Sequence, residues 1–72
     1  MTTFEIGMMY VRACYPVTFE GVRDWLLEQA DGFTEENADA KTQRFLSDAL
    51  VRRMIDRDGT CYDLRRGKYD GR

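Results

Sequence analysis

Residues 40–64 read A-K-T-Q-R-F-L-S-D-A-L-V-R-R-M-I-D-R-D-G-T-C-Y-D-L, and their hydrophobic period changes part-way along. In the first half, Phe45, Leu46, Ala49 and Leu50 recur at helical spacing and form one apolar stripe. This spacing predicts an amphipathic helix with a polar, basic outer face. The polar side chains that fall mostly on that outer face are Lys41, Gln43, Arg44, Ser47 and Asp48.

A β-hairpin is predicted directly after this helix. Two short β-prone runs, residues 54–57 and 60–64, flank Asp58-Gly59. Asp-Gly between such runs is a strong hairpin signal, because a type I′ turn needs positive φ at both central residues. The segment is therefore expected to be a basic helix that runs straight into a tight hairpin.

The size and composition of the chain fit one small folded domain. It has 72 residues, of which 43% are hydrophobic and 12% aromatic. No apolar run approaches the roughly 20 residues that span a bilayer, and the first residues lack the basic region of a signal peptide. We expect a cytoplasmic protein with a domain over residues 1–64 and a basic, flexible tail over residues 65–72.

Charge is divided unevenly along the chain. Residues 1–40 carry two arginines against eight acids, a net charge of −6, whereas residues 41–72 carry nine Lys and Arg against five Asp, a net charge of +4. Such asymmetry suggests one face for an anionic partner, although an ordinary solvated surface is the plainer interpretation.

The cysteine and histidine content argues against catalysis and metal binding. Histidine is absent, and Cys14 and Cys61 are far apart in sequence, so no zinc-ligand pattern is present and no cofactor is expected. Histidine is the usual general base, so we expect that the chain is not an enzyme. The two cysteines are interpreted as buried free thiols, with a Cys14–Cys61 disulfide as the alternative.

Two further helices are predicted before residue 40. The first is capped by Thr2 or Thr3 and stops before Pro16, although residues 4–10 also alternate at the strand period. Pro16-Val17 is a short extended link suited to pairing with the hairpin as a third strand. The second helix runs from Phe19 to about Ala30.

The capping residues are clear for the second helix but ambiguous for the start of the third. Thr18 is expected to cap the second helix, and Gly32 to end it in the left-handed position. In the acidic stretch that follows, either Thr34 caps a short helical turn or Asn37 or Asp39 caps the third helix directly.

The order helix, link, helix, turn, helix, hairpin resembles winged-helix regulators of the MarR and IclR type. T-F-E-G-V-R-D-W-L-L resembles their second helix, K-T-Q-R-F-L-S-D-A-L-V their recognition helix and M-I-D-R-D-G-T-C-Y-D-L their wing. The resemblance covers about residues 4–64 and implies an α+β fold, a winged helix-turn-helix of three helices followed by a small β-hairpin wing. The family usually has glycine where the recognition helix exits, whereas this chain has Arg53.

The resemblance implies a small DNA-binding transcriptional regulator whose third helix enters the major groove of double-stranded DNA. Arg44 is the best candidate to read guanine and Gln43 to read adenine, while Lys41 and Thr42 are expected at phosphates. The plainer alternative is that these side chains are only solvated, with Asp48 holding Arg44 in an i,i+4 pair. The full set of candidate DNA contacts is Lys41, Thr42, Gln43, Arg44, Ser47, Arg52, Arg57, Arg65, Arg66 and Lys68.

A function of a different class is also compatible with this fold. A winged-helix protein–protein interaction module, acting as an accessory factor or inhibitor of a larger complex, fits the acidic first half of the chain. A homodimer through the first helix and Met8, Met9 or Tyr10 is compatible with either function. DNA binding requires a continuous positive face over residues 41–68, which the acids at 48, 56 and 63 would interrupt in an interaction module.

Overall fold

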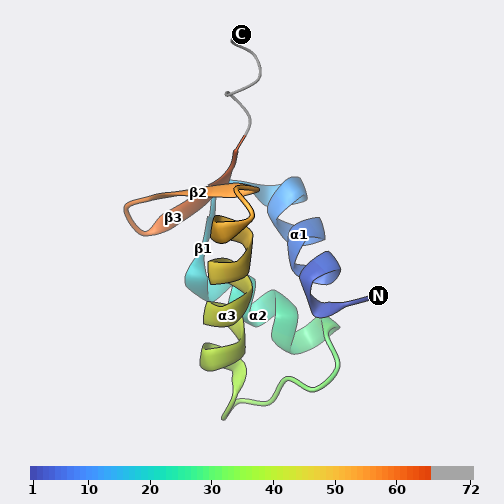
Figure 1. Ribbon diagram of the computed structural model, residues 1–72. Helices are drawn as coiled ribbons and strands as arrows, with labels where there is room; N and C mark the ends of the chain where they lie inside the picture. Colours follow the sequence, from blue (N-terminus) through green and yellow to red (C-terminus); the bar gives the residue numbers. More distant parts are fainter. Residues whose placement is uncertain (66–72) are drawn as a thin grey trace, which may run out of the picture.

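The computed structural model describes residues 1–65, which form three helices and one small antiparallel sheet, an α+β arrangement compatible with a winged-helix layout. In chain order the elements are α1 (Thr3–Cys14), β1 (Val17–Thr18), α2 (Phe19–Gln29), α3 (Ala38–Val51), β2 (Ile55–Asp58) and β3 (Cys61–Leu64). The strands lie in the order β1-β3-β2. In Figure 1 the β2–β3 hairpin projects from the end of the molecule where α1 and α3 finish.

Local capping sets the limits of α1. The Thr2 hydroxyl accepts a hydrogen bond from the Glu5 backbone N–H (3.1 Å), and the Glu5 carboxylate accepts one from the Thr2 backbone N–H (2.9 Å). This capping box satisfies two otherwise unpaired backbone donors. The helix ends at Cys14, ahead of Pro16. The helix prediction is confirmed, and the strand alternative for residues 4–10 is wrong.

The extended link after Pro16 joins the sheet as predicted. Val17 pairs with Tyr62 and Thr18 with Cys61, which makes β1 the third strand. The Thr18 hydroxyl then accepts a hydrogen bond from the Gly21 N–H (3.0 Å) and caps α2. One short segment thus ends a strand and starts a helix.

In the segment from α2 to α3, Thr34 caps a short turn as one predicted scheme has it, whereas neither Asn37 nor Asp39 caps α3 with its side chain. Gly32 has a φ of 86°, but Ala30 is the C-cap, so the glycine lies one position later than expected. Thr34 and Asn37 bond each other reciprocally, each side chain accepting from the other's backbone N–H. The Asn37 side chain is therefore used on this turn, and α3 begins at Ala38 without a side-chain cap.

The hairpin is present, but its turn is one residue later than predicted. Asp58 pairs with Cys61, so Gly59 and Thr60 are the two central residues. Gly59 has a φ of 66°, whereas Thr60 is not among the residues with positive φ. Glycine with positive φ at the first central position is the type II′ pattern, so the predicted type I′ turn is wrong.

Arg53 ends α3 in the position that glycine usually takes. The Arg53 N–H donates to the Leu50 carbonyl (3.0 Å) and the Met54 N–H to the Ala49 carbonyl (3.0 Å), the bond pair of a Schellman motif. Arg53 has a φ of 62°, the only positive φ of a non-glycine residue in the described chain. The helix exit keeps the usual geometry, at a conformational cost on the order of 1 kcal/mol.

The core lies where the three helices meet the inner face of the sheet. The predicted apolar stripe of α3 is confirmed, with Leu50 half-buried. Trp25 is half-buried, donates its indole N–H to the Ile6 carbonyl (3.1 Å) and stacks on Tyr10. The buried apolar residues are Met8, Val11, Val17, Val22, Leu26, Ala30, Ala38, Phe45, Leu46, Ala49 and Ile55.

Arg65, the first residue of the predicted tail, follows the last residue of β3 and donates its N–H to the Met54 carbonyl (3.1 Å). The rest of the predicted tail, residues 66–72, lies outside the described residues. Cys14 and Cys61 are both free thiols, and Cys14 is exposed because it lies on the outer side of the last turn of α1, so the prediction that it is buried is wrong.

Candidate nucleic-acid interface

The outer stripe of α3 has an unusual composition for a solvated helix. Its residues lie opposite the buried stripe at spacings of three and four, and all are exposed, Val51 by 78%. An ordinary exposed stripe is rich in Lys and Glu, whereas this one has a single charge, on Arg44, and three small or apolar side chains. We call it the α3 outer stripe, and it consists of Ala40, Gln43, Arg44, Ser47 and Val51.

Arg44 is available to an external ligand. None of the ion pairs or hydrogen bonds within residues 1–65 uses its guanidinium. The i,i+4 pair with Asp48 that the sequence suggested is not formed. Gln43 and Ser47, its neighbours on the stripe, have no side-chain partner in the described chain either, so three potential hydrogen-bonding side chains face solvent together.

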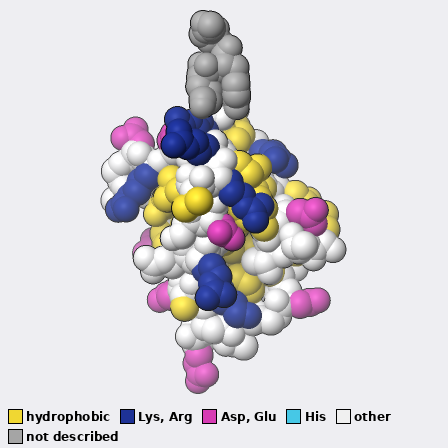
Figure 2. Space-filling model, in the orientation of Figure 1, with side chains coloured by type: hydrophobic (Ala, Val, Ile, Leu, Met, Phe, Trp, Pro, Cys, Tyr) yellow, Lys and Arg dark blue, Asp and Glu magenta, His cyan; other side chains and the backbone are white. Residues whose placement is uncertain are grey.

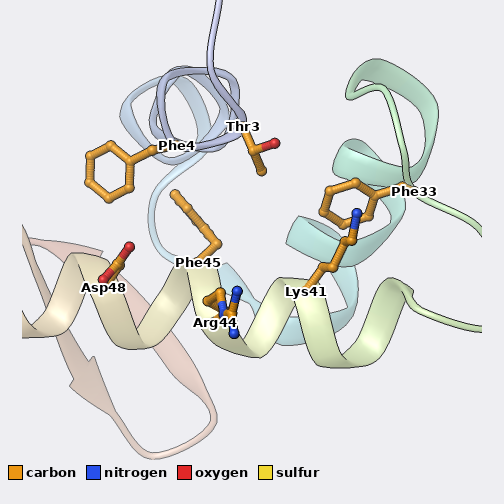
Figure 3. A pocket seen from close by; sticks show the side chains of 7 residues that line it. All are labelled: Thr3, Phe4, Phe33, Lys41, Arg44, Phe45 and Asp48. Atoms are coloured by element: carbon orange, nitrogen blue, oxygen red, sulfur yellow. The ribbon is translucent and has the colours of Figure 1, made fainter.

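Lys41 lies beside the stripe but is held by the chain itself. Its Nζ donates to the Gly32 carbonyl (3.0 Å) and lies 5.5 Å from the centre of the Phe33 ring. Figure 3 shows the lysine turned toward that ring. Lys41 therefore anchors the α2–α3 loop, and contact with a phosphate would have to compete with this attachment.

The prediction that Thr42 contacts a phosphate needs correction. The sequence placed it at a phosphate, but its side chain faces the core and is completely buried. Its hydroxyl has no hydrogen-bond partner among the described residues. The reason is that the buried face of α3 is wide, with Ala38, Thr42 and Ala49 at its centre.

The remaining candidate cations have partners inside the molecule. The Arg52 guanidinium lies 4.3 Å from the centre of the Phe4 ring, so it ties the end of α3 to the start of α1. Arg57 donates to the Gly59 carbonyl across the hairpin turn (3.2 Å), and Arg65 pairs with Asp56 (3.3 Å). Arg66 and Lys68 lie outside the described residues.

The positive face is therefore present but interrupted. Figure 2 shows dark blue side chains over the face that carries α3, with a magenta side chain among them. Of the three acids expected to break this face, Asp56 is paired with Arg65, and Asp63 accepts from the Leu64 N–H. Asp48 has no ion-pair partner in residues 1–65 and remains a negative charge beside the stripe.

The acidic stretch before α3 is partly neutralised by Arg23 on α2. Its guanidinium bonds Asp39 and also reaches Glu35 and Asp24. The hydrogen bond to Asp39 raises the pKa of Arg23 above its ordinary value, with attraction from the three carboxylates adding to the shift and burial opposing it. Arg23 thus links α2 to the start of α3 and reduces the repulsion that these acids exert on an anion.

A hollow of about 250 Å³ opens beside the α3 outer stripe, between α3, the start of α1 and the α2–α3 loop. Three phenylalanines supply its apolar surface, and Arg44 lies at its edge (Figure 3). No feature of the sequence indicated it, because its parts come from segments about 30 residues apart. Its lining residues are Thr3, Phe4, Phe33, Lys41, Arg44, Phe45 and Asp48.

Sequence reasoning also missed two members of the stripe, Ala40 and Val51. The signal was present, because continuing from Gln43 and Ser47 by steps of three and four reaches both. Apolar side chains usually belong to a core, so the spacing alone does not indicate a role for them at the surface.

Other classes of site are not assembled in the described residues. Within residues 1–65 no three His, Cys, Asp or Glu side chains come together to hold a metal ion. None of the helices there has the length and apolar content needed to cross a bilayer.

Comparison with known proteins found no matching family model, no matching curated protein and no matching solved structure.

Proposed function

We propose that this chain is a winged helix-turn-helix module that binds double-stranded DNA, with α3 in the major groove. The observation that carries the proposal is the α3 outer stripe, which is exposed, free of acids and equipped with the unpaired Arg44. The element order α1-β1-α2-α3-β2-β3 and the sheet order β1-β3-β2 support it, because they are compatible with the winged-helix layout that presents such a helix.

The chemistry of the stripe suits base edges. Arg44 can donate two parallel hydrogen bonds to guanine, and Gln43 can pair with adenine. The methyl groups of Ala40 and of Val51, which is 78% exposed, suit the methyl group of thymine. Each good paired contact contributes about 1–3 kcal/mol of discrimination against a wrong base.

Phosphate contacts are expected to be few. Arg57 and Arg65 remain exposed or half-buried, but each would have to share its guanidinium with an internal partner. Asp48 opposes phosphate approach on the side of α3 that faces α1. We therefore expect modest affinity for a single copy and a shallow dependence on salt, since the slope scales with the number of phosphates neutralised.

The test is fluorescence anisotropy on two duplexes, one selected from a random pool with this protein and one scrambled version of it, at several salt concentrations. Arg44→Ala is expected to lower the preference for the selected duplex by roughly 5- to 150-fold, the equivalent of one guanine contact. Arg53→Gly removes the same charge from a residue off the stripe, and it should weaken both duplexes equally.

Two outcomes would contradict DNA binding through the α3 outer stripe. If no duplex binds at low salt while circular dichroism shows a folded protein, DNA is not the partner. Equal loss of preference in both variants would also count against the stripe, because it would make the effect a matter of net charge.

A protein-interaction module is the second candidate, and the hollow favours it. An apolar hollow with Asp48 at its border is unfavourable for DNA but is an ordinary feature of a protein contact. Under this function Phe33→Ser, which removes part of the apolar surface, would abolish capture of a partner while leaving anisotropy on DNA unchanged.

A further inference from the structure

All four methionines of the chain line one groove along the side of α1. Met1 and Met9 are 83% and 46% exposed, whereas Met8 is buried at the base of the groove and Met54 is half-buried. The hollow measures about 450 Å³. Methionine side chains are flexible and polarizable, so such a surface adapts readily to another apolar surface.

The two ends of this groove carry opposite charges. Glu5 lies in the first turn of α1 and Arg12 in the last, and both line the groove together with Met9. Residues 5, 9 and 12 follow one another by four and three, so they share one helix face. At 1.5 Å per residue, Glu5 and Arg12 are separated by about 10 Å along the axis. Neither is part of an ion pair within residues 1–65.

We propose that the groove binds α1 of a second copy of this chain, with the two helices antiparallel about a two-fold axis. In that arrangement Glu5 of each copy faces Arg12 of the other, and the axis passes between Met8 and Met9. A two-fold interface uses the same patch on both copies and must be self-complementary. An acid at one end, a base at the other and methionines between them meet that requirement, whereas parallel helices would place like charges together.

The order of charges along the groove favours a second copy of the chain as its partner. Glu5 already caps the start of α1. An unrelated apolar partner would bury the exposed methionines equally well but would leave the charge of Arg12 unpaired. Only a partner with the reversed order of charges satisfies both ends, and an antiparallel copy has that order by construction. The contact of two three-turn helices is at the low end of specific interfaces, so the dimer should be weak, with micromolar or weaker affinity.

The decisive experiment is sedimentation velocity on two charge-reversal variants, separately and mixed. Arg12→Glu places Glu5 against an acid in both pairs of the dimer, and Glu5→Arg places Arg12 against a base in both. Each variant alone should self-associate at least tenfold more weakly than the wild type. An equimolar mixture should recover wild-type affinity, because the copy with two acids now faces the copy with two bases.

Recovery on mixing separates the interface from a folding defect, which a second defective protein cannot repair. Glu5 also belongs to the capping box, so Glu5→Gln, which keeps an acceptor for the Thr2 N–H, provides a second variant with the charge removed. This variant too should weaken self-association. Glu28→Arg and Arg44→Glu are the matched controls, since both residues are exposed away from the groove. Neither control should change the self-association affinity.

Three results would overturn the proposal. The wild type could remain monomeric up to millimolar concentration, the variants could associate as well as the wild type, or the mixture could stay as weak as its components. None of them bears on DNA binding by a single copy, so this proposal and the proposed function stand or fall separately.

Discussion

Gly7→Ala gives opposite predictions from local and tertiary reasoning. Gly7 is in the interior of α1, where alanine is favoured over glycine by about 1 kcal/mol. Helix propensity alone therefore predicts that the substitution stabilises the protein. The structure places the Phe45 ring against this glycine: an added Cβ would lie 2.5, 2.6 and 2.9 Å from three ring atoms.

The ring has little freedom to move away. Phe45 is 4% exposed and meets the Phe4 ring edge-to-face, with centroids 5.5 Å apart. Adding atoms to a packed core typically costs about 1–3 kcal/mol. Three sub-3 Å contacts on a buried ring point to the upper part of that range, so after the gain in propensity we expect Gly7→Ala to lose about 1–2 kcal/mol. A domain of this size has roughly 4–11 kcal/mol in total, so the loss is easily measured.

Urea denaturation followed by circular dichroism measures the effect, with two companions. In a Phe45→Leu background the added methyl has room, so Gly7→Ala should become neutral or stabilising, a coupling of about 1–3 kcal/mol between residues in contact. Ala13→Gly, at an exposed position of the same helix, should lose about 1 kcal/mol and calibrates propensity alone. If Gly7→Ala stabilises the wild type by about 1 kcal/mol, the packing argument is wrong.

Two further substitutions test other features of α3. Arg53→Gly relieves the left-handed strain at the end of the helix and should stabilise the protein by about 1 kcal/mol in urea denaturation; a loss of stability would mean that the arginine side chain makes an essential contact. Thr42→Val removes a buried hydroxyl that has no partner among residues 1–65 and should raise stability by about 1 kcal/mol without weakening DNA binding, whereas a selective loss of binding would return Thr42 to the interface.

Much of the local structure was predictable because its causes lie within a few residues of one another. A threonine cap at Thr2 or Thr3, the Thr18 cap and the stop before Pro16 are such cases, and the structure chooses Thr2. The Asp58-Gly59 signal also identified the hairpin, and helical spacing identified the apolar stripe of α3. The turn itself was assigned one residue early, because Asp58-Gly59 and Gly59-Thr60 are both acceptable hairpin centres and the pairing of Asp58 with Cys61 chooses between them.

The candidate interface was only half predictable. Helical spacing placed Gln43, Arg44 and Ser47 outside, where the structure has them. It could not show that Thr42 is buried or that Lys41 is held by the α2–α3 loop, because both depend on how widely α3 is covered by its neighbours. Nor could it show that Arg44 lacks a partner, since an i,i+4 acid was available in the sequence.

Local signals in the sequence predicted the order and approximate extent of the helices and strands, because caps, turns and periodicity act over one to four residues. The hairpin turn and the left-handed glycine after α2 still lie one position later than those signals indicated. Which side chains remain free depends on long-range packing. Gly7 is required by a ring 38 positions away, and Arg52 is occupied by Phe4. Those contacts join segments whose separation in space is set by packing of the whole core, and no local pattern records it.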